Sequence, residues 1–227
     1  MISNPPLRRI RSFVRRVGRL TEGQQRALDQ LWSVYGLKSD CCLDINSIFD
    51  RAAPLTLEIG FGSGTSLAAM AEAAPDINFL GIEVHRPGVG HLLYELQKRQ
   101  LSNVRVWCHD AVEILACQIP DQSLDRVLLF FPDPWPKRKH HKRRLIQADF
   151  VTLLGHKLKP GGQLHLATDW DHYAKHMLKT LDSSPLFRNL AGASQYTSRP
   201  EYRPETRFEA RGKRLGHTVR DLLFERI

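Results

Sequence analysis

An acidic residue stands at the end of each of four consecutive apolar segments of this sequence. Glu83, Asp110, Asp133 and Asp169 stand at or just after the ends of the second to fifth segments, and a glycine-rich stretch follows the first. Such residues often cap the next helix or form a turn, but that explanation is strained when successive strand ends share it. Ligands of open parallel sheets bind outside the carboxyl ends of the strands. We therefore predict one ligand site that these acids share.

The glycine-rich stretch, residues 60–64, is called the glycine loop. Gly60, Gly62 and Gly64 occupy relative positions one, three and five, whereas the dinucleotide fingerprint needs a glycine at position six, where this chain has Thr65. A pyrophosphate-binding loop is therefore disfavoured. Glu83 is placed to accept hydrogen bonds from both hydroxyls of a ribose. S-adenosylmethionine, which has a ribose and no phosphate, meets these requirements.

Glu58 comes just before the glycine loop. S-adenosylmethionine carries a positive charge on its sulfonium and another on its ammonium group. A carboxylate near the loop would favour this ligand electrostatically, directly or through water. The alternative role for Glu58 is an ion pair with an Arg or Lys elsewhere in the fold.

Residues 130–137, the proline loop, form the least ordinary string of the chain. Pro132, Pro134 and Pro136 alternate with Asp133 and Trp135, and because proline fixes φ, we predict a rigid turn that positions reacting groups. Amino-methyltransferases of nucleic acids place a similar acid or amide, prolines and an aromatic ring here. The acid orients the target base and the ring stacks on it. A structural turn around a buried Trp is the alternative.

Basic charge is confined to two segments. The chain has 33 Lys and Arg against 24 Asp and Glu, but residues 1–20 and 137–144 each hold six basic residues and no acid, which leaves a net charge of −3 on the remainder. Such confinement is typical of a protein that binds a polyanion, although each cluster alone also suits a solvated tail or loop. The second cluster continues directly from the proline loop, which favours a nucleic acid over a small molecule.

Helical and strand-like periodicities alternate along the chain. A first helix is predicted for residues 21–36, where Thr21 opens a capping box and Gly36 ends the pattern. Strands are predicted at residues 55–59, 78–84, 104–108, 126–131, 162–168 and 219–227. Further helices are predicted at residues 65–74, 87–100, 111–117, 144–158 and 171–181. Charges alternate along residues 198–213, which suits an exposed strand and a loop equally well.

This alternation predicts βαβ units. The expected fold class is α/β, with a Rossmann-like, doubly wound, mostly parallel sheet that has helices on both faces, plus a basic N-terminal arm and helix. We expect the arm and helix to occupy residues 1–50, and the ligand-binding domain to occupy residues 51–227.

Composition excludes several classes of protein. A content of 42% hydrophobic residues is ordinary for a globular chain and excludes disorder throughout, and no apolar run is long enough to cross a bilayer. Cys41, Cys42, Cys108 and Cys117 form no CxxC pair, and the histidines show no zinc spacing. We predict reduced thiols in a cytosol, no metal and no membrane association.

Six short segments form a combination of motifs that is specific to one enzyme family. They are residues 57–64, 81–83, 132–137, 142–144, 167–169 and 206–209. Through them the chain resembles the bacterial tRNA (guanine-N7-)-methyltransferase family over nearly its whole length. An Arg-rich segment without acids is also typical of a mitochondrial transit peptide. The resemblance includes residues 11–16 and 18–25, and implies instead that the arm belongs to a mature, cytoplasmic protein.

The resemblance implies that residues 51–227 transfer a methyl group from S-adenosylmethionine to N7 of a guanine in the tRNA variable loop. It implies cofactor contacts for Glu58, Glu83, Asp110 and Asp133, with Asp133 also the active-site residue. It implies substrate binding by Lys137, Asp169, Thr206, Arg207, Phe208 and Glu209. It implies RNA binding by Lys139, His140, His141, Lys142, Arg143 and Arg144.

Methylation at guanine N7 makes modest chemical demands. N7 has a lone pair and no proton to lose, so no general base is needed, and we expect positioning of nitrogen, methyl and sulfur in line to dominate. Asp133 is expected to accept hydrogen bonds from the guanine N1 or N2 hydrogens and to offset the charge that develops on the ring, with Asp169 or Glu209 assisting.

Two functions from other classes stay open. A nicotinamide-dependent oxidoreductase is disfavoured by Thr65 in the glycine loop fingerprint. A non-catalytic RNA-binding module would explain the basic clusters but not the acids at the strand ends or the proline loop. A monomer and a homodimer are equally compatible with the sequence.

Overall fold

The computed structural model describes residues 12–13, 18–38, 44–214 and 216–227. In chain order its elements are α1 (Glu22–Tyr35), α2 (Ile45–Phe49), β1 (Leu55–Ile59), α3 (Thr65–Ala73), β2 (Asn78–Ile82), α4 (Arg86–Lys98), β3 (Val104–Trp107), α5 (Ala111–Cys117), β4 (Leu124–Phe130), the 3-10 helix η1 (Arg138–Arg143), α6 (Ala148–Lys157), β5 (Leu158–Thr168), α7 (Asp171–Asp182), β6 (Phe187–Asn189), α8 (Arg207–Arg214) and β7 (Arg220–Arg226). Cys41, Cys42 and most of the basic arm lie outside the described residues.

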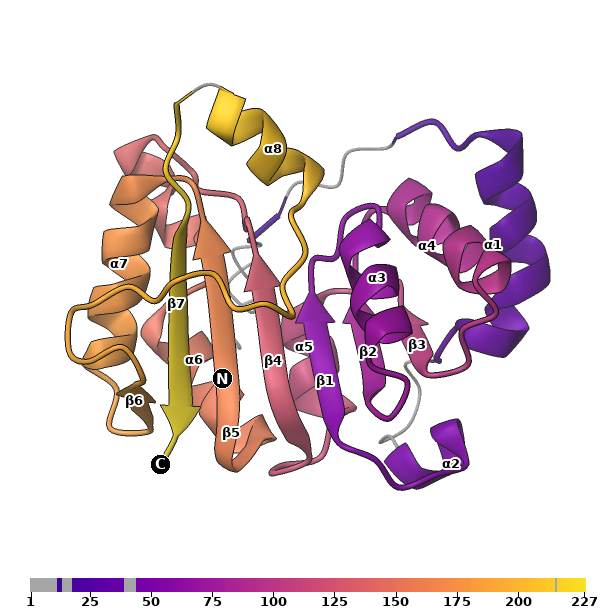
Figure 1. Cartoon of the computed structure of the whole chain (residues 1–227), viewed down its shortest axis with the longest axis horizontal. Coiled ribbons are helices and arrows are strands. Elements are labelled where there is room, and N and C mark those ends of the chain that lie inside the picture. The colour runs from indigo at the N-terminus through magenta and orange to yellow at the C-terminus, as the bar shows by residue number, and fades with distance from the viewer. Residues whose placement is uncertain (1–11, 14–17, 39–43, 215) are drawn as a thin grey trace, which may run out of the picture.

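A seven-stranded sheet in the order β3-β2-β1-β4-β5-β7-β6 forms the centre of the fold (Figure 1). Strands β1 to β5 run parallel, and β7 runs antiparallel to both of its neighbours. The strand order reverses between β1 and β4. Crossovers leave these two strands in opposite directions, which opens a ligand-binding crevice at their carboxyl ends.

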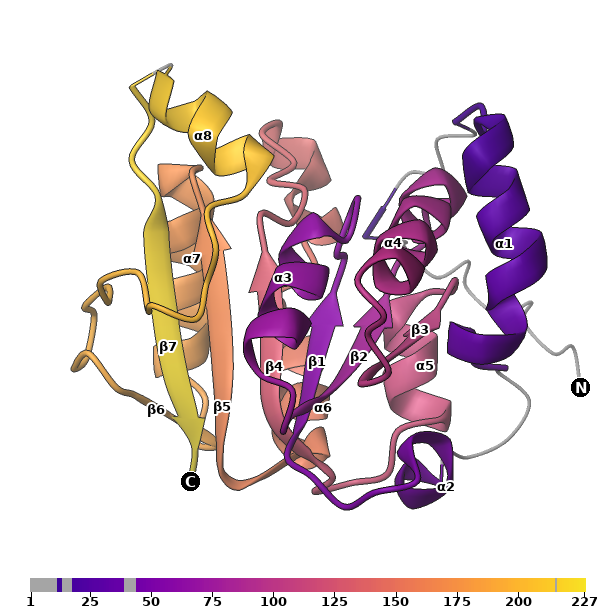
Figure 2. The same cartoon turned by 45° about the vertical axis from the view of Figure 1, so that its right-hand side comes forward.

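Helices cover both faces of the sheet, as Figures 1 and 2 show. On one face α3 and α4 cover β1 to β3, with α1 packed outside α4, and on the other face lie α5, α6 and α7. The segment between β6 and α8 crosses the α3 face in front of β7, β5 and β4 (Figure 1). α8 then lies beyond the carboxyl end of β5. The doubly wound, mostly parallel α/β fold predicted from the sequence is confirmed.

The first helix begins where its capping box predicts. Thr21 Oγ1 accepts from the Gln24 amide at 3.3 Å, and Gln24 Oε1 accepts from the Thr21 amide at 3.0 Å. Ala27, Leu28 and Leu31 are buried in the same cluster as the apolar residues of α4. Burial of this apolar stripe, more than helix propensity, holds a helix of this length in place.

The prediction for residues 198–213 was incomplete. An exposed strand or loop was expected there, but residues 207–214 form α8, and both Arg203 and Glu209 are buried. The alternation of charges suggested exposure, but two of the alternating residues, Arg203 and Glu209, form an ion pair inside the protein. Thr206 Oγ1 accepts from the Glu209 amide at 3.1 Å. The Thr-x-x-Glu pattern at residues 206–209 was therefore the signal that could have revealed the start of the helix.

Three further short elements, α2, η1 and β6, were not predicted, and β5 begins at residue 158, before the predicted start at residue 162. The helix predicted from residue 144 begins only at Ala148. None of the described helices is long and apolar enough to span a membrane.

Candidate active site

A cavity of about 770 Å³ lies at the carboxyl ends of β1, β2, β3 and β4. Gly60, Glu83, Asp110 and Asp133 all line it, each from a different strand end. Its volume is in the usual range for small-molecule sites. The structure thus brings together three of the four acids that follow the apolar segments. Asp169 is not among the lining residues.

The glycine loop passes through three left-handed residues. Gly60, Gly62 and Gly64 have φ values of 72°, 59° and 74°, which only glycine adopts without strain. A Cβ on Gly60 or Gly62 would meet no atom within 4 Å, whereas a Cβ on Gly64 would lie 2.5 Å from Leu92 Cβ. The first two glycines therefore leave space for a ligand against the backbone, and the third lets the start of α3 approach α4.

Glu83 is held against the glycine loop by backbone amides. Its Oε2 accepts from Gly62 at 2.8 Å, and its Oε1 accepts from Val84 and His85 at 2.7 and 2.9 Å. Each carboxylate oxygen accepts about two hydrogen bonds, so Oε2 keeps one position for a ligand hydroxyl. Binding both hydroxyls of a ribose would require one of the backbone amides to be displaced.

Glu58 is a buried carboxyl of β1 that lies next to the cavity but does not line it. Its exposed fraction is 3%, and its Oε2 has no hydrogen-bond partner among the described residues. Burial, followed by repulsion from Glu83, raises the pKa of Glu58 to about 8. Among the described residues, no Arg or Lys forms an ion pair with Glu58. The alternative considered from the sequence, an ion pair elsewhere in the fold, is therefore not found in this part of the chain. A cationic ligand would supply the missing charge.

The proline loop has a strained backbone on both sides of Asp133. Phe131 and Trp135 have φ values of 52° and 45°, a region that costs non-glycine residues of order 1–3 kcal/mol each and that clusters at functional sites. The Phe131 amide donates to the Ala167 carbonyl at 2.7 Å. Asp133 is exposed at the cavity between these two residues.

Arg144 is buried against the proline loop and donates a hydrogen bond to its backbone. Its exposed fraction is 2%; its Nε donates to the Pro134 carbonyl at 2.9 Å, and its Nη1 lies 3.1 Å from His172 Nδ1. The guanidinium carbon is 4.9 Å from the centre of the Tyr173 ring, and burial lowers the pKa of Arg144. This burial does not suit the phosphate contact expected from the sequence, and Arg144 differs in this from its neighbours.

Trp135 connects the proline loop to the arm and to η1. Its indole N–H donates to the Ser12 carbonyl at 3.0 Å, and Arg143 and His140 lie 5.0 and 5.8 Å from its ring. Desolvation, followed by repulsion from Arg143 and other cations of η1, lowers the pKa of His140. The ring expected to stack on a base thus also carries side chains of the basic cluster.

The remaining cations of the cluster face solvent. Lys137, Lys139 and Lys142 are exposed. They lie on η1 and at its start, directly beyond the proline loop. The described part of the basic cluster therefore borders the cavity without lining it.

The predicted substrate-binding residues after β5 and around α8 form a separate group. Asp169 Oδ2 lies 3.4 Å from His217 Nδ1, just after α8. Thr206 caps α8, and Glu209 is 2% exposed because Arg203 binds its carboxylate. The side chains of Arg207 and Phe208 lie outside the described residues. None of these residues lines the cavity in the part of the chain that the structure describes.

Sequence reasoning missed other residues at the cavity. Ser12 and Phe13 of the arm line it, as do His85 and His109. The two histidines sit at strand ends beside Glu83 and Asp110, so strand-end position was a signal that applied to them as well. Nothing in the pattern of residues 12–13 predicts contact with a loop that follows more than a hundred residues later.

The glycine loop, Glu83 and Glu58 fit S-adenosylmethionine. Gly60 and Gly62 leave open space in which a ligand could lie against the protein backbone. Oε2 of Glu83 can still accept a hydrogen bond, and the unpartnered Oε2 of Glu58 suits a cation. Among the described residues, His, Cys, Asp and Glu form no cluster able to hold a metal ion.

Known proteins share both the sequence and the fold. A family model described as "Putative methyltransferase" matches residues 52–222. A protein of Alcanivorax borkumensis named tRNA (guanine-N(7)-)-methyltransferase is 58% identical over 221 residues, which are 97% of this chain and 92% of the relative. A protein of the same name from Pectobacterium atrosepticum is 59% identical over 223 residues, 98% of this chain and 93% of the relative.

The chain belongs to the tRNA (guanine-N(7)-)-methyltransferase family. The family predicted from six short segments is therefore confirmed. A solved SAM-dependent O-methyltransferase of Thermotoga maritima has a TM-score of 0.52 and 18% identity, over 81% of this chain and 63% of that one. At 18% identity this likeness concerns the fold alone, and it shows that the two proteins share the same Rossmann-like architecture.

Proposed function

We propose that this protein transfers the methyl group of S-adenosylmethionine to N7 of a guanine in the variable loop of tRNA. The observation that carries the proposal is the cavity shared by the glycine loop, Glu83, Asp110 and the proline loop. It joins a site for a cationic nucleoside to a rigid acidic loop, and exposed cations border it. Membership in the tRNA (guanine-N(7)-)-methyltransferase family supports the choice of substrate. The reaction would take place in the cytoplasm.

Three acidic side chains and two glycines would hold the cofactor. Glu83 would accept from a ribose hydroxyl, Gly60 and Gly62 would let the ligand approach the backbone, and Glu58 would balance its positive charge. Asp110 caps α5 by accepting from the Val112 amide at 2.9 Å, which fixes its carboxylate at the cavity wall. The bound cofactor supplies the electrophilic methyl group.

Asp133 would act on the guanine. Exposed at the cavity and held between two strained residues, its carboxylate can accept from the N1 and N2 hydrogens and hold N7 in line with the methyl group. Its negative charge would also offset the charge that develops on the ring in the transition state. No proton leaves N7, so Asp133 need not act as a base.

The substrate contacts outside the cavity follow from the position of the cations. Lys137, Lys139, His140, His141, Lys142 and Arg143 would bind the tRNA backbone. Asp169 and residues 206–208 would contact the substrate from the α8 side, whereas the carboxylate expected to join them, that of Glu209, is buried against Arg203. Arg144 is better explained as a support of the proline loop. Residues 1–50 would form an arm and helix beside the catalytic domain of residues 51–227.

The proposal is tested by single-turnover methylation of unmodified tRNA with methyl-labelled S-adenosylmethionine and nucleoside analysis. We expect label in 7-methylguanosine from the variable loop. Asp133→Asn and Asp133→Ala, at saturating cofactor, should be slower by about 100-fold or more, because a misplaced acceptor loses both positioning and charge stabilisation. Label confined to another nucleoside would contradict the proposed function, and unchanged rates in both variants would remove Asp133 from the mechanism.

A further inference from the structure

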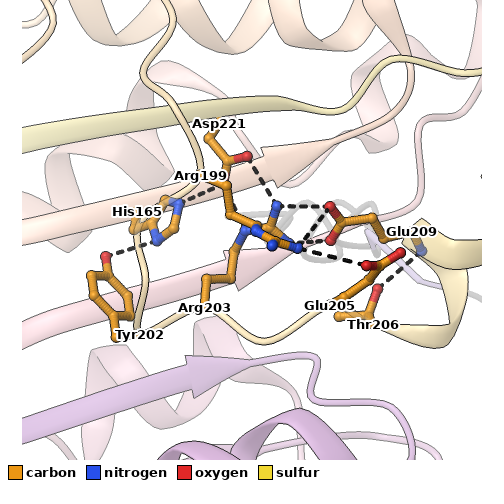
Figure 3. Close-up of polar contacts among 8 residues, drawn as sticks. All are labelled: His165, Arg199, Tyr202, Arg203, Glu205, Thr206, Glu209 and Asp221. Atoms are coloured by element: carbon orange, nitrogen blue, oxygen red, sulfur yellow. Dashed lines mark hydrogen bonds and ion pairs between the residues drawn. The ribbon is translucent and has the colours of Figure 1, made fainter. Parts of the chain in front are cut away.

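Arg203 is a fully buried cation in the segment between β6 and α8. Its side chain is 0% exposed. Its Nη1 donates to Glu209 Oε2 at 2.6 Å, its Nη2 donates to Asp221 Oδ2 at 3.0 Å, and its Nε lies 2.7 Å from Asp221 Oδ1 (Figure 3). The carboxylates of α8 and β7 thus hold the guanidinium from two directions, as Figure 3 shows.

The third contact of Arg203 is with the proline loop. The guanidinium carbon lies 5.7 Å from the centre of the Phe130 ring and 5.9 Å from that of Phe131, within the range of cation–π attraction. Phe131 lines the cavity in a left-handed conformation, two residues before Asp133. One guanidinium therefore joins α8, β7 and the root of the loop that carries the active-site acid.

A buried histidine orients one of the carboxylates. His165 Nε2 lies 2.8 Å from Asp221 Oδ1, and Tyr202 Oη lies 2.8 Å from His165 Nδ1 (Figure 3). Burial lowers the pKa of His165. In a neutral ring, Nε2 of His165 donates to Asp221 and Nδ1 accepts from Tyr202. These two hydrogen bonds fix the direction in which Asp221 faces Arg203.

Stability alone does not account for such a cluster. Replacing buried ion pairs with well-packed apolar residues is often neutral or stabilising. What an Arg supplies that apolar groups and Lys do not is a planar fork, which binds two carboxylates and stacks against rings in one fixed geometry. The value of Arg203 therefore lies in geometry, and the geometry it fixes includes the neighbours of Asp133.

We propose that Arg203 is a positioning residue for methyl transfer: it fixes Phe130 and Phe131 at the start of the proline loop, and through Glu209 it fixes α8 beside the same site. The proposal rests on the proposed function. It gives Glu209 a role that does not need direct substrate contact, because Glu209 acts on the site through Arg203. The two segments that the sequence motifs mark, residues 132–137 and 206–209, are then parts of one assembly.

Arg203→Lys tests the proposal because it keeps the buried charge but loses the fork. We expect kcat at saturating tRNA and cofactor to fall by about 10- to 100-fold. We expect the KM for S-adenosylmethionine and the melting temperature to stay close to those of the wild type. Glu209→Gln should lower kcat similarly, and the double variant should be no slower than the worse single variant, because both changes break one contact.

Arg188→Lys is the matched control. Arg188 is exposed on β6, and its Nη2 lies 2.8 Å from Oε1 of Glu225 on β7. Its replacement should leave kcat unchanged. Wild-type kcat in Arg203→Lys, or multiplicative losses in the double variant, would overturn the proposal. If Arg203→Lys does not fold, the kcat of Glu209→Gln decides, and a wild-type value there overturns the proposal too. Failure of the wild-type protein to form 7-methylguanosine would instead contradict the proposed function.

Discussion

At the scale of single residues, Glu58 shows how a site can be prepared for a cation before the cation arrives. Its carboxyl is buried on β1 beside Glu83, and burial raises its pKa to about 8. Near neutral pH Glu58 therefore holds a proton much of the time. A bound cation would favour the charged form, so binding would release that proton.

The raised pKa predicts a pH-dependent stability. Between the ordinary pKa near 4.5 and about 8, folded Glu58 keeps a proton that unfolded Glu58 has lost, so the free energy of unfolding falls as pH rises through this window. Glu58→Gln cannot titrate and should lack this contribution. Between pH 6 and 8.5 the wild type should lose up to about 2–3 kcal/mol more than the variant. Urea unfolding at both pH values measures the difference, and equal losses would show that Glu58 does not titrate in this window.

At the scale of elements, the basic residues 137–144 have two different roles, depending on whether they lie on η1 or pack against the proline loop. Lys139 and Lys142 face solvent on η1, whereas Arg144, just past its end, is buried under Pro134. Cationic residues of the same cluster thus differ in their role according to their position relative to a short helix.

Changes in η1 should separate RNA affinity from catalysis. Replacing both Lys139 and Lys142 with Ala should weaken tRNA binding and lower the slope of log K against log salt by roughly one per lost phosphate contact. Arg144→Ala should leave that slope unchanged and lower kcat instead, because the loop carbonyl loses its donor. Filter binding at several salt concentrations checks the slopes.

The control for these variants is a pair of exposed lysines at helix ends away from the cavity. Lys98 on α4 and Lys179 on α7 are exposed, and replacing both with Ala removes the same charge. A salt slope that falls equally in the control pair would mean that η1 makes no specific contact.

The candidate site could be predicted from the sequence where a single strand end carries its own signal. The glycine loop, Glu83, Asp110 and Asp133 each follow a recognisable strand and lie at one cavity. Arg203 could not be found this way, because its partners lie 6 and 18 residues later and across the sheet. Burial of charge depends on packing between distant segments, which local patterns do not record.

At the scale of the whole molecule, the sheet up to β5 followed from local periodicity. Each βαβ unit obeys a fixed handedness, so strand order needed few long-range choices. The positions of β7 and β6 could not be predicted in the same way, because antiparallel strands at the end of a sheet have no crossover rule. β7 was recognised as a strand, but its place between β5 and β6 is known only from the structure.

β7 should contribute strongly to global stability. Phe224 is fully buried in the core that α5, α6 and α7 cover, whereas the preceding residue, Leu223, faces the opposite side and is half-buried. Phe224→Ala should lower the free energy of unfolding by about 3–5 kcal/mol, and Leu223→Ala should lower it by clearly less. Denaturant unfolding compares the two, and an equal or smaller loss for Phe224→Ala would contradict this place for the core.

The late position of β7 in the chain also sets an order of events during translation. β5 ends at residue 168 and β7 begins at residue 220, so the ribosome adds about 50 residues while the edge of β5 has no partner. At typical elongation rates this takes about 3 to 10 s. During that interval the nascent protein presents an open strand edge, which other chains can pair with. Arg203 and Glu209 also emerge before Asp221, so the assembly around Arg203 is completed only when the last strand arrives.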